Sequence, residues 1–181
     1  MSDLLDAPVT PQVTSQTAPV ETPTLQPAVV EIEADDTVAV VEDTPDYRSL
    51  AAAVAAQDHA AEDRELRCLA AGVYFESNGE PLAGQLAVAE TILNRTKSGR
   101  FPKSVCSVLT QRGQFSFVRG GVVPMAEGRN GWKTAVAVAK VAIRDLWDGD
   151  ADGALFFHAR RVSPGWRMTR IASIGNHVFY R

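Results

Sequence analysis

The sequence predicts a mainly helical domain of the α+β class, with a small β element near its carboxyl end. Two segments, 66–74 and 82–93, carry apolar residues at the spacing of helices that bury one face. The short runs "ALFFHA" and "HVFYR" near the carboxyl end are aromatic and β-branched, which is typical of strands. Together these patterns predict a helical core followed by a short antiparallel element.

Charge divides the chain into an acidic tail and a basic domain. Residues 1–46 hold ten acidic residues, six of the ten prolines and no Lys or Arg, a composition that predicts a disordered tail. The remainder has 12 acidic residues against all 18 basic ones, a formal charge of about +6. We expect an Ala-rich linker or helix at 47–61 and the domain itself at 62–181. Its charge favours an anionic partner, such as a nucleic acid, a membrane surface or a cell wall polymer.

Several classes of protein are disfavoured by what the sequence lacks. There is no run of 18 apolar residues, so we expect no membrane span. The amino terminus has neither a basic start nor an apolar core, so no secretory signal is visible and the localisation stays open. Cys68 and Cys106 are either one disulfide of an exported protein or two buried thiols of a cytosolic one. They lack metal-ligand spacing, and we expect neither a metal nor a cofactor.

The first strong helix pattern ends at the stretch "YFESNGEP". Leu66, Leu69 and Val73 lie on one face of this helix, and the following Asn-Gly pair supplies a stop. At 100° per residue Glu76 lies about 20° from Leu69 on the helix circumference. Its carboxyl is therefore expected to be half buried, whereas Glu80 lies beyond Gly79 in the elbow before the next helix.

The remaining elements follow from similar patterns. Pro81 is expected in the first turn of a second helix that runs to about 96, and a short third helix is expected at 102–111. Glycines at 113–121 predict an irregular loop. A long helix is expected from about 131 to 147, with Asn130 as its cap. The sequence "IGNH" at 174–177 predicts a two-residue hairpin turn between two strands.

A half-buried glutamate at a helix end has a chemical use. Burial raises a carboxyl pKa, and an acid that keeps its proton near neutral pH can protonate the leaving oxygen of a glycosidic bond. Most glutamates at helix ends are nevertheless solvated surface groups. The residues alone therefore leave three readings of Glu76 and Glu80: a catalytic pair, one catalyst with a helper, or two surface groups.

Three ordered stretches resemble one known family. They are "CLAAGVYFESNGEPLAGQLAVAETILNRT", "RFPKSVCSVLTQRGQFSFV" and "ALFFHARRVSPGWRMTRIASIGNHVFYR", and together they are similar to the SleB-like cell wall hydrolases, which include spore cortex-lytic enzymes. The resemblance spans residues 62–181. It implies a lysozyme-like, lytic transglycosylase-like fold that cuts peptidoglycan between N-acetylmuramic acid and N-acetylglucosamine. It also implies that Glu76 is the general acid, and Ser77 is similar to the serine of the Glu-Ser pair in other lytic transglycosylases.

In such an enzyme one carboxyl acts first as acid and then as base, so no second carboxylate need be the nucleophile. Glu80 is accordingly interpreted as a helper or a structural cap, which accepts backbone N–H bonds at the second helix or holds the acid in place. The distance between the two carboxyls, and with it the choice between hydrolysis and transglycosylation, stays open.

The same resemblance suggests residues that bind the sugar chain. Many relatives flank the "QFSF" stretch with cysteines where this chain has Gly113 and Arg119. Polar groups beside aromatic rings suit pyranose binding, although each residue could equally be an ordinary turn or core residue. The candidates for substrate binding are Tyr74, Gln114, Ser116, Phe117, His158, Trp166 and His177.

The leading hypothesis is therefore an enzyme that cleaves peptidoglycan glycan strands, most simply as a lytic transglycosylase. The alternative is a non-catalytic peptidoglycan-binding or regulatory domain of the same fold. Peptidoglycan strands are the expected partner, nucleic acid is not expected, and we expect a monomer that acts at the cell wall or in the periplasm.

Overall fold

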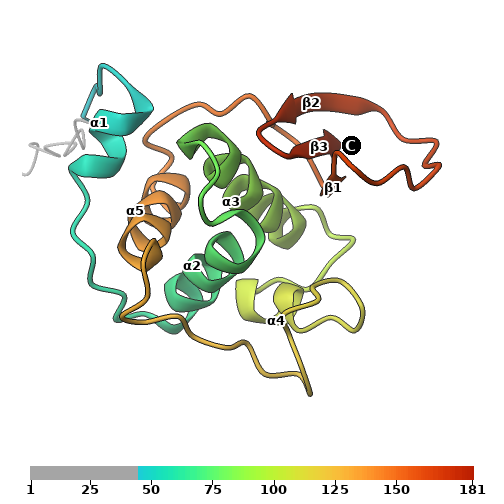
Figure 1. The fold of residues 1–181 in the computed structure, drawn as a ribbon, viewed down its shortest axis with the longest axis horizontal. Helices are drawn as coiled ribbons and strands as arrows, with labels where there is room; N and C mark the ends of the chain where they lie inside the picture. Colours follow the sequence, from blue (N-terminus) through green and yellow to red (C-terminus); the bar gives the residue numbers. More distant parts are fainter. Residues whose placement is uncertain (1–44) are drawn as a thin grey trace, which may run out of the picture. The chain divides into compact units, whose positions relative to one another are not determined.

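The structure, a computed structural model, describes residues 45–181. The predicted disordered tail at 1–46 lies outside the described residues, apart from its last two. A helical core followed by a small sheet confirms the predicted fold class (Figure 1). In chain order the elements are α1 (Leu50–Ala55), α2 (Arg64–Ser77), α3 (Leu82–Lys97), α4 (Val105–Leu109), α5 (Trp132–Ile143), β1 (Phe156–Ala159), β2 (Arg170–Ile174) and β3 (His177–Tyr180).

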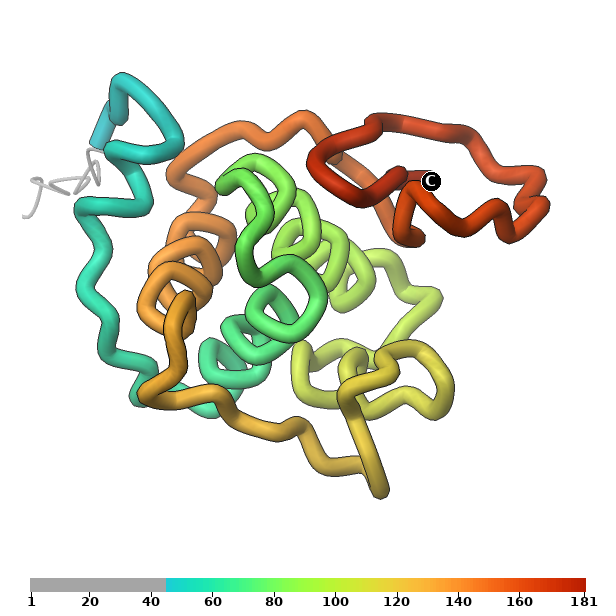
Figure 2. The backbone as a smooth tube through the Cα atoms, in the orientation of Figure 1, coloured from blue at the N-terminus to red at the C-terminus, as the bar shows by residue number. Residues whose placement is uncertain are grey.

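Three helices form the centre of the core. Helices α2, α3 and α5 pack against one another, and α4 packs on α2 and α3 (Figures 1 and 2). The helices approach closely at Gly72 of α2, where a Cβ atom would lie 2.8 Å from Ile92 Cδ1 and 3.3 Å from a Leu109 methyl group. A side chain at this position would displace the Ile92 and Leu109 side chains, which belong to α3 and α4. This tight contact fixes α2, which carries Glu76 near its carboxyl end.

Local bonds define both ends of α2. The Asp63 side chain caps its start by accepting a hydrogen bond from the Leu66 backbone N–H at 2.8 Å. The helix ends at Ser77, and Gly79 follows with a φ of 87°, a left-handed conformation suited to glycine. The predicted Asn-Gly stop is confirmed. Pro81 occupies the capping position before α3, one residue earlier than expected.

The carboxyl end of α5 corrects the prediction of a helix to about 147. The helix ends at Ile143 because Asp145 adopts a φ of 54°. The next backbone N–H, of Leu146, then turns back to donate to the Val141 carbonyl oxygen at 3.1 Å. This bond closes the helix in the manner of a Schellman motif, with aspartate where glycine is usual. The apolar repeat in the sequence therefore continued beyond the helix itself.

The start of α5 differs from expectation as well. The capping position is held by Gly131, with a φ of 86°, and no side chain caps the helix there. The expected role of Asn130 as the cap is therefore wrong. The Trp132 backbone N–H instead donates to the Arg129 carbonyl oxygen at 3.1 Å, so a main-chain turn replaces the side-chain cap.

The carboxyl end forms a three-stranded antiparallel sheet in the order β1-β3-β2. Ile174 pairs with His177 across Gly175 and Asn176, which confirms the predicted two-residue hairpin turn. In the other ladder His158 pairs with Val178, and Ala159 with His177. The two histidines therefore lie on adjacent strands, and α3 packs against this sheet.

The two cysteines are joined. A disulfide links Cys68 in α2 to Cys106 in α4, so of the two alternatives left open by the sequence the structure contains the bonded one. Among the helices of residues 45–181, none combines the length and apolar character required to cross a bilayer.

Candidate active site

Glu76 lies in the last turn of α2 and is half buried, as its helical phase predicts. Burial raises the pKa of its carboxyl above the usual value, and the positive charge of Arg95 partly opposes this rise. A carboxyl in this setting holds its proton to a higher pH than a solvated glutamate does. Glu76 thus has the electrostatic character of a general acid.

Glu76 lies on the wall of a cavity of about 510 Å³ between the helical core and the sheet. The cavity brings together four of the predicted sugar-binding residues from segments far apart in the sequence: Gln114, His158, Trp166 and His177. Among its lining residues in the described part of the chain, Glu76 is the one carboxylic acid. The remaining lining residues are Arg95, Gly113, Phe115, Phe156, Phe157, Ala159, Val162, Pro164 and Met168.

One wall of the cavity is an aromatic cluster around Trp166. This side chain is 40% exposed and packs edge-on against the rings of His158 at 5.4 Å, Tyr180 at 5.7 Å and Phe156 at 6.1 Å. Packing on three sides orients the indole while leaving part of it open. Such a ring can pack against the apolar face of a pyranose.

His158 is held by hydrogen bonds on both sides of its ring. Its Nδ1 lies 2.9 Å from the Ala159 carbonyl oxygen, and its Nε2 lies 3.0 Å from the Tyr180 hydroxyl. Because a carbonyl can only accept, Nδ1 carries the proton and Nε2 accepts from Tyr180. Both nitrogens are therefore engaged, and His158 contributes its ring surface to the cavity.

Arg95 is a charged residue of the site that sequence reasoning missed. It is 4% exposed, its Nε donates to the Leu155 carbonyl oxygen at 2.8 Å, and its guanidinium lies over the rings of Phe101, Phe115 and Phe156. Burial lowers its pKa to about 10, which leaves it charged at neutral pH. Its Nη1 is buried and makes no hydrogen bond to any described residue. Burying a cation that has no bonded carboxylate lowers the stability of a protein. The position of Arg95 near Glu76 therefore suggests that its charge serves the function of the site.

Glu80 and Ser77 are held away from the cavity lining. The Ser77 side chain is buried and donates to the Val73 carbonyl oxygen at 2.7 Å, a bond within the helix. Glu80 turns toward the β2–β3 hairpin, where its Oε1 lies 3.0 Å from His177 Nδ1. The carboxylate therefore contacts a histidine of the cavity and not the acid itself.

Three predicted sugar-binding residues lie outside this cavity. Tyr74 packs against Phe75 and Trp132 at ring distances of 5.1 Å and 6.2 Å. Phe117 stacks on Phe75 at 5.0 Å, so its face is occupied by protein. Ser116 is exposed on the loop between α4 and α5.

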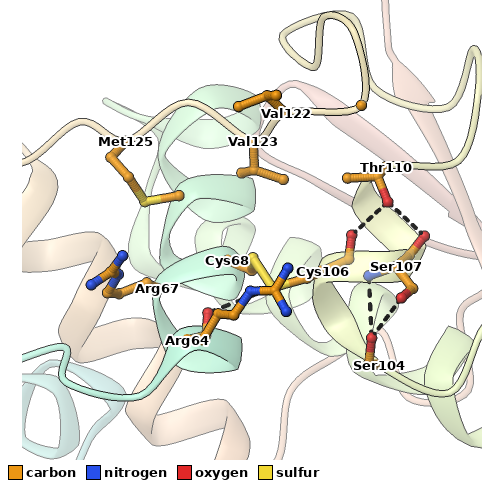
Figure 3. Close-up of a pocket in the computed structure, with 11 residues that line it drawn as sticks. Arg64, Arg67, Cys68, Ser104, Cys106, Ser107, Thr110, Val122, Val123 and Met125 are labelled. Carbon is orange, nitrogen blue, oxygen red and sulfur yellow. Dashed lines mark hydrogen bonds between the residues drawn. A yellow bond between two sulfur atoms is a disulfide. The ribbon is translucent and has the colours of Figure 1, made fainter.

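A second hollow, of about 370 Å³, lies at the opposite end of α2 (Figure 3). The disulfide forms part of its wall, and Arg64 and Arg67 of α2 lie beside it. None of its lining residues in the described chain is a carboxylic acid. The cavity that contains Glu76 is therefore the better candidate for acid catalysis.

A further half-buried carboxyl, Glu90 of α3, lies in a small hollow formed with the segment 145–152. Its carboxylate packs against Gly149, whose backbone N–H lowers its pKa, and it faces the carboxylates of Asp145, Asp148 and Asp152. Burial, reinforced by these negative charges, raises the pKa of Glu90 to about 7. Within residues 45–181 no set of three His, Cys, Asp or Glu side chains is arranged to hold a metal ion.

Comparison with known proteins assigns the domain to a family. Residues 79–180 match the sequence profile of a family described as Cell Wall Hydrolase, which is more than half of the chain. The chain belongs to the cell wall hydrolase family. The resemblance drawn from its sequence motifs is thereby confirmed, and so is the prediction of an enzyme of this class.

Curated relatives of this cell wall hydrolase are spore cortex-lytic enzymes. That of Oceanobacillus iheyensis is 33% identical over 120 residues, or 64% of this chain and 41% of the relative. That of Bacillus subtilis is 33% identical over 122 residues, or 65% of this chain and 37% of the relative. The chain thus spans about two fifths of the length of these relatives.

Solved structures with the same fold include two SleB catalytic domains. The catalytic domain of the germination-specific lytic transglycosylase SleB from Bacillus anthracis has a TM-score of 0.57 and 30% identity, and the match covers 69% of this chain and all of that one. The SleB catalytic domain of Bacillus cereus has a TM-score of 0.55 and 31% identity, with 65% and 89% covered. These matches confirm the predicted lysozyme-like fold class of the hydrolase domain.

Proposed function

We propose that this cell wall hydrolase cleaves the glycan strand of peptidoglycan between N-acetylmuramic acid and N-acetylglucosamine, as a lytic transglycosylase with Glu76 as its acid and base. The observation that carries the proposal is a single carboxyl of raised pKa on the wall of an aromatic-lined cavity. The lytic transglycosylase activity stated for the Bacillus anthracis SleB domain supports the same reaction here.

The first half of the reaction needs Glu76 in its protonated form. Its proton passes to the bridging oxygen while the bond from that oxygen to C1 of N-acetylmuramic acid breaks, and the N-acetylglucosamine portion leaves as an alcohol. Burial supplies the required form near neutral pH because it disfavours the carboxylate.

In the second half the carboxylate of Glu76 removes the proton from the 6-hydroxyl of the same N-acetylmuramic acid. The hydroxyl oxygen bonds to C1 and closes a 1,6-anhydro ring, which returns the proton to Glu76. Here the positive charge of Arg95 helps, since it favours the ionised carboxyl that the first half leaves behind. The two opposing influences on Glu76 thus suit the two halves of one reaction.

The lining of the cavity favours this one-acid mechanism over hydrolysis with two carboxylates. Glycosidases of the retaining and inverting classes place a second carboxylate about 5–5.5 Å or about 6.5–9.5 Å from the first. Among the described residues Glu76 is the one carboxylic acid that lines this cavity, and the Glu80 carboxylate contacts the hairpin at Asn176 and His177.

Digestion of purified sacculi, followed by mass spectrometry of the products, tests the proposal. The wild type should release 1,6-anhydro ends, and Glu76→Gln should release none while it keeps its fold. Glu127→Gln, at an exposed surface position, is the matched control and should retain activity. Products with reducing ends would contradict the one-acid mechanism, and bound protein on intact sacculi would favour the alternative of a non-catalytic binding domain.

A further inference from the structure

Glu80 is fastened at the tip of the β2–β3 hairpin through both of its oxygens. Its Oε2 accepts a hydrogen bond from the Asn176 backbone N–H at 3.0 Å, and its Oε1 lies 3.0 Å from His177 Nδ1. The side chains of Glu80 and His177 are each only 8% exposed. Because both side chains are shielded from water, this contact between residues 80 and 177 differs from a solvent-exposed ion pair.

Two glycines provide the space that this carboxylate fills. Gly175 has a φ of 54°, and a Cβ atom there would collide with Glu80 Oε2. A Cβ atom at Gly84, one turn along α3, would lie 2.9 Å from the same oxygen. The chain therefore leaves room for the Glu80 carboxylate on both sides, at the junction of α3 and the hairpin turn.

The contact with Glu80 determines which nitrogen of His177 carries the proton. Nδ1 is buried and makes no well-aligned hydrogen bond to any described residue, Glu80 included. The Glu80 carboxylate oxygen at 3.0 Å is nevertheless the polar atom that faces it. A carboxylate can only accept, so Nδ1 bears the hydrogen and Nε2 bears the lone pair.

Burial also favours the neutral imidazole. Burial lowers the pKa of His177, the nearby Glu80 carboxylate opposes this effect, and His158 on the neighbouring strand adds to it. Glu76 and Arg95 are the other ionisable groups that line the same cavity. His177 is therefore neutral at neutral pH, and its ring lies on the cavity wall with an accepting nitrogen.

We propose that Glu80 and His177 form a positioning pair, in which Glu80 fixes the imidazole so that Nε2 accepts a hydrogen bond from a sugar hydroxyl of the bound glycan. The proposal rests on the proposed function, because it places a pyranose in the cavity of Glu76. His158 cannot take this part, since Ala159 and Tyr180 occupy both of its nitrogens. Glu80 then acts on the substrate through His177, and the chemical group selected is a hydroxyl donor.

Two substitutions at position 177 separate the role of Nε2 as an acceptor for the sugar from the contact of Nδ1 with Glu80. In His177→Asn the amide nitrogen takes the place of Nδ1 and can still donate to Glu80, but nothing replaces Nε2. In His177→Gln the amide group reaches the place of Nε2 and the Nδ1 donor is lost. We expect His177→Asn to keep its melting temperature within a few degrees and to lower kcat/KM on soluble glycan strands roughly threefold to tenfold, the range for one hydrogen bond.

The pH profile supplies a readout that a purely structural role would not move. Protonation of His177 turns its acceptor into a donor, so wild-type activity should fall at acid pH as the imidazole becomes charged. That acid limb should be absent from the His177→Asn profile. In Glu80→Gln the carboxylate that favours the charged imidazole is gone, so the acid limb should move to lower pH.

These measurements distinguish failure of the inference from failure of the proposed function. Wild-type kcat/KM and an unchanged acid limb in His177→Asn would overturn the inference, even where Glu76→Gln abolishes cleavage. If the wild type cleaves nothing, calorimetry measures the affinity of each variant for a peptidoglycan tetrasaccharide and so tests the hydrogen bond from the sugar to His177. Equal affinity for wild type and His177→Asn overturns the inference. If His177→Asn fails to fold, the shift of the acid limb in Glu80→Gln decides.

Discussion

Removing the charge of Glu90 should stabilise the domain at neutral and alkaline pH. Glu90 is half buried under segment 145–152, faces the carboxylates of Asp145, Asp148 and Asp152, and has a pKa of about 7 against a usual value of 4.5. The folded state thus binds this proton more tightly than the unfolded state does. Stability from this group is greatest at low pH and is lost as pH rises from about 4.5 through 7.

The size of the effect follows from the two pKa values. The difference between 4.5 and about 7 corresponds to about 3 kcal/mol of unfolding free energy when the carboxyl is fully ionised. Because part of the side chain stays in contact with water, we reduce this to about 2 kcal/mol. Glu90→Gln keeps the shape and an oxygen beside the Gly149 backbone, so it should recover most of this amount at pH 8. For a domain of this size that is roughly 6 to 8 °C in Tm.

Urea unfolding at pH 8 and at pH 4 measures the effect, because Glu90 is ionised at the first pH and largely protonated at the second. We expect Glu90→Gln to be more stable than wild type at pH 8 and nearly equal at pH 4. Asp150→Asn, an exposed position in the same segment, is the control and should change stability little at either pH. A gain of equal size at both pH values would refute the argument, as would a loss at pH 8.

Two further predictions concern the cavity and the hairpin. Replacing Arg95 with Met removes the charge that opposes the raised pKa of Glu76, so the alkaline limb of the pH–activity profile should move to higher pH; an unmoved limb would contradict the electrostatic role. Gly175→Ala should lower Tm by several degrees more than Gly165→Ala, because both have positive φ but only position 175 has the Glu80 carboxylate against it; equal losses would show that backbone strain alone matters.

Local patterns were enough to predict that Glu76 is half buried and that a hairpin turn lies near the carboxyl end. The position of Glu76 beside Leu69 follows from helix geometry, and the hairpin at Gly175 and Asn176 follows from turn chemistry, so both needed only a few neighbouring residues. The end of α5 was mispredicted because the apolar repeat continues into Leu146, where the backbone has already turned at Asp145. An apolar residue can thus follow the helical repeat of α5 in the sequence although it lies beyond the end of the helix.

Contacts between distant segments could not be obtained in this way. Arg95 shares a helix face with Val88 and Ile92, both fully buried, and this phase was the available signal that its charge lies inside. Nothing in the sequence, however, places it beside Glu76. Likewise the pairing of Glu80 with His177 depends on how the hairpin docks on α3, which no local pattern encodes.

The disulfide closes a covalent ring that contains the helical residues of the site. Glu76, Glu80 and Arg95 all lie between Cys68 and Cys106, which are 38 residues apart. In the chain-entropy description a ring of this size contributes about 4 kcal/mol, a large fraction of the 5–15 kcal/mol that stabilises an ordinary domain. The reduced chain would therefore hold its acid, its arginine and the anchor of its hairpin much less firmly. Redox conditions would then act as a maturation step, in which the hydrolase gains its full stability only where its two thiols can be oxidised.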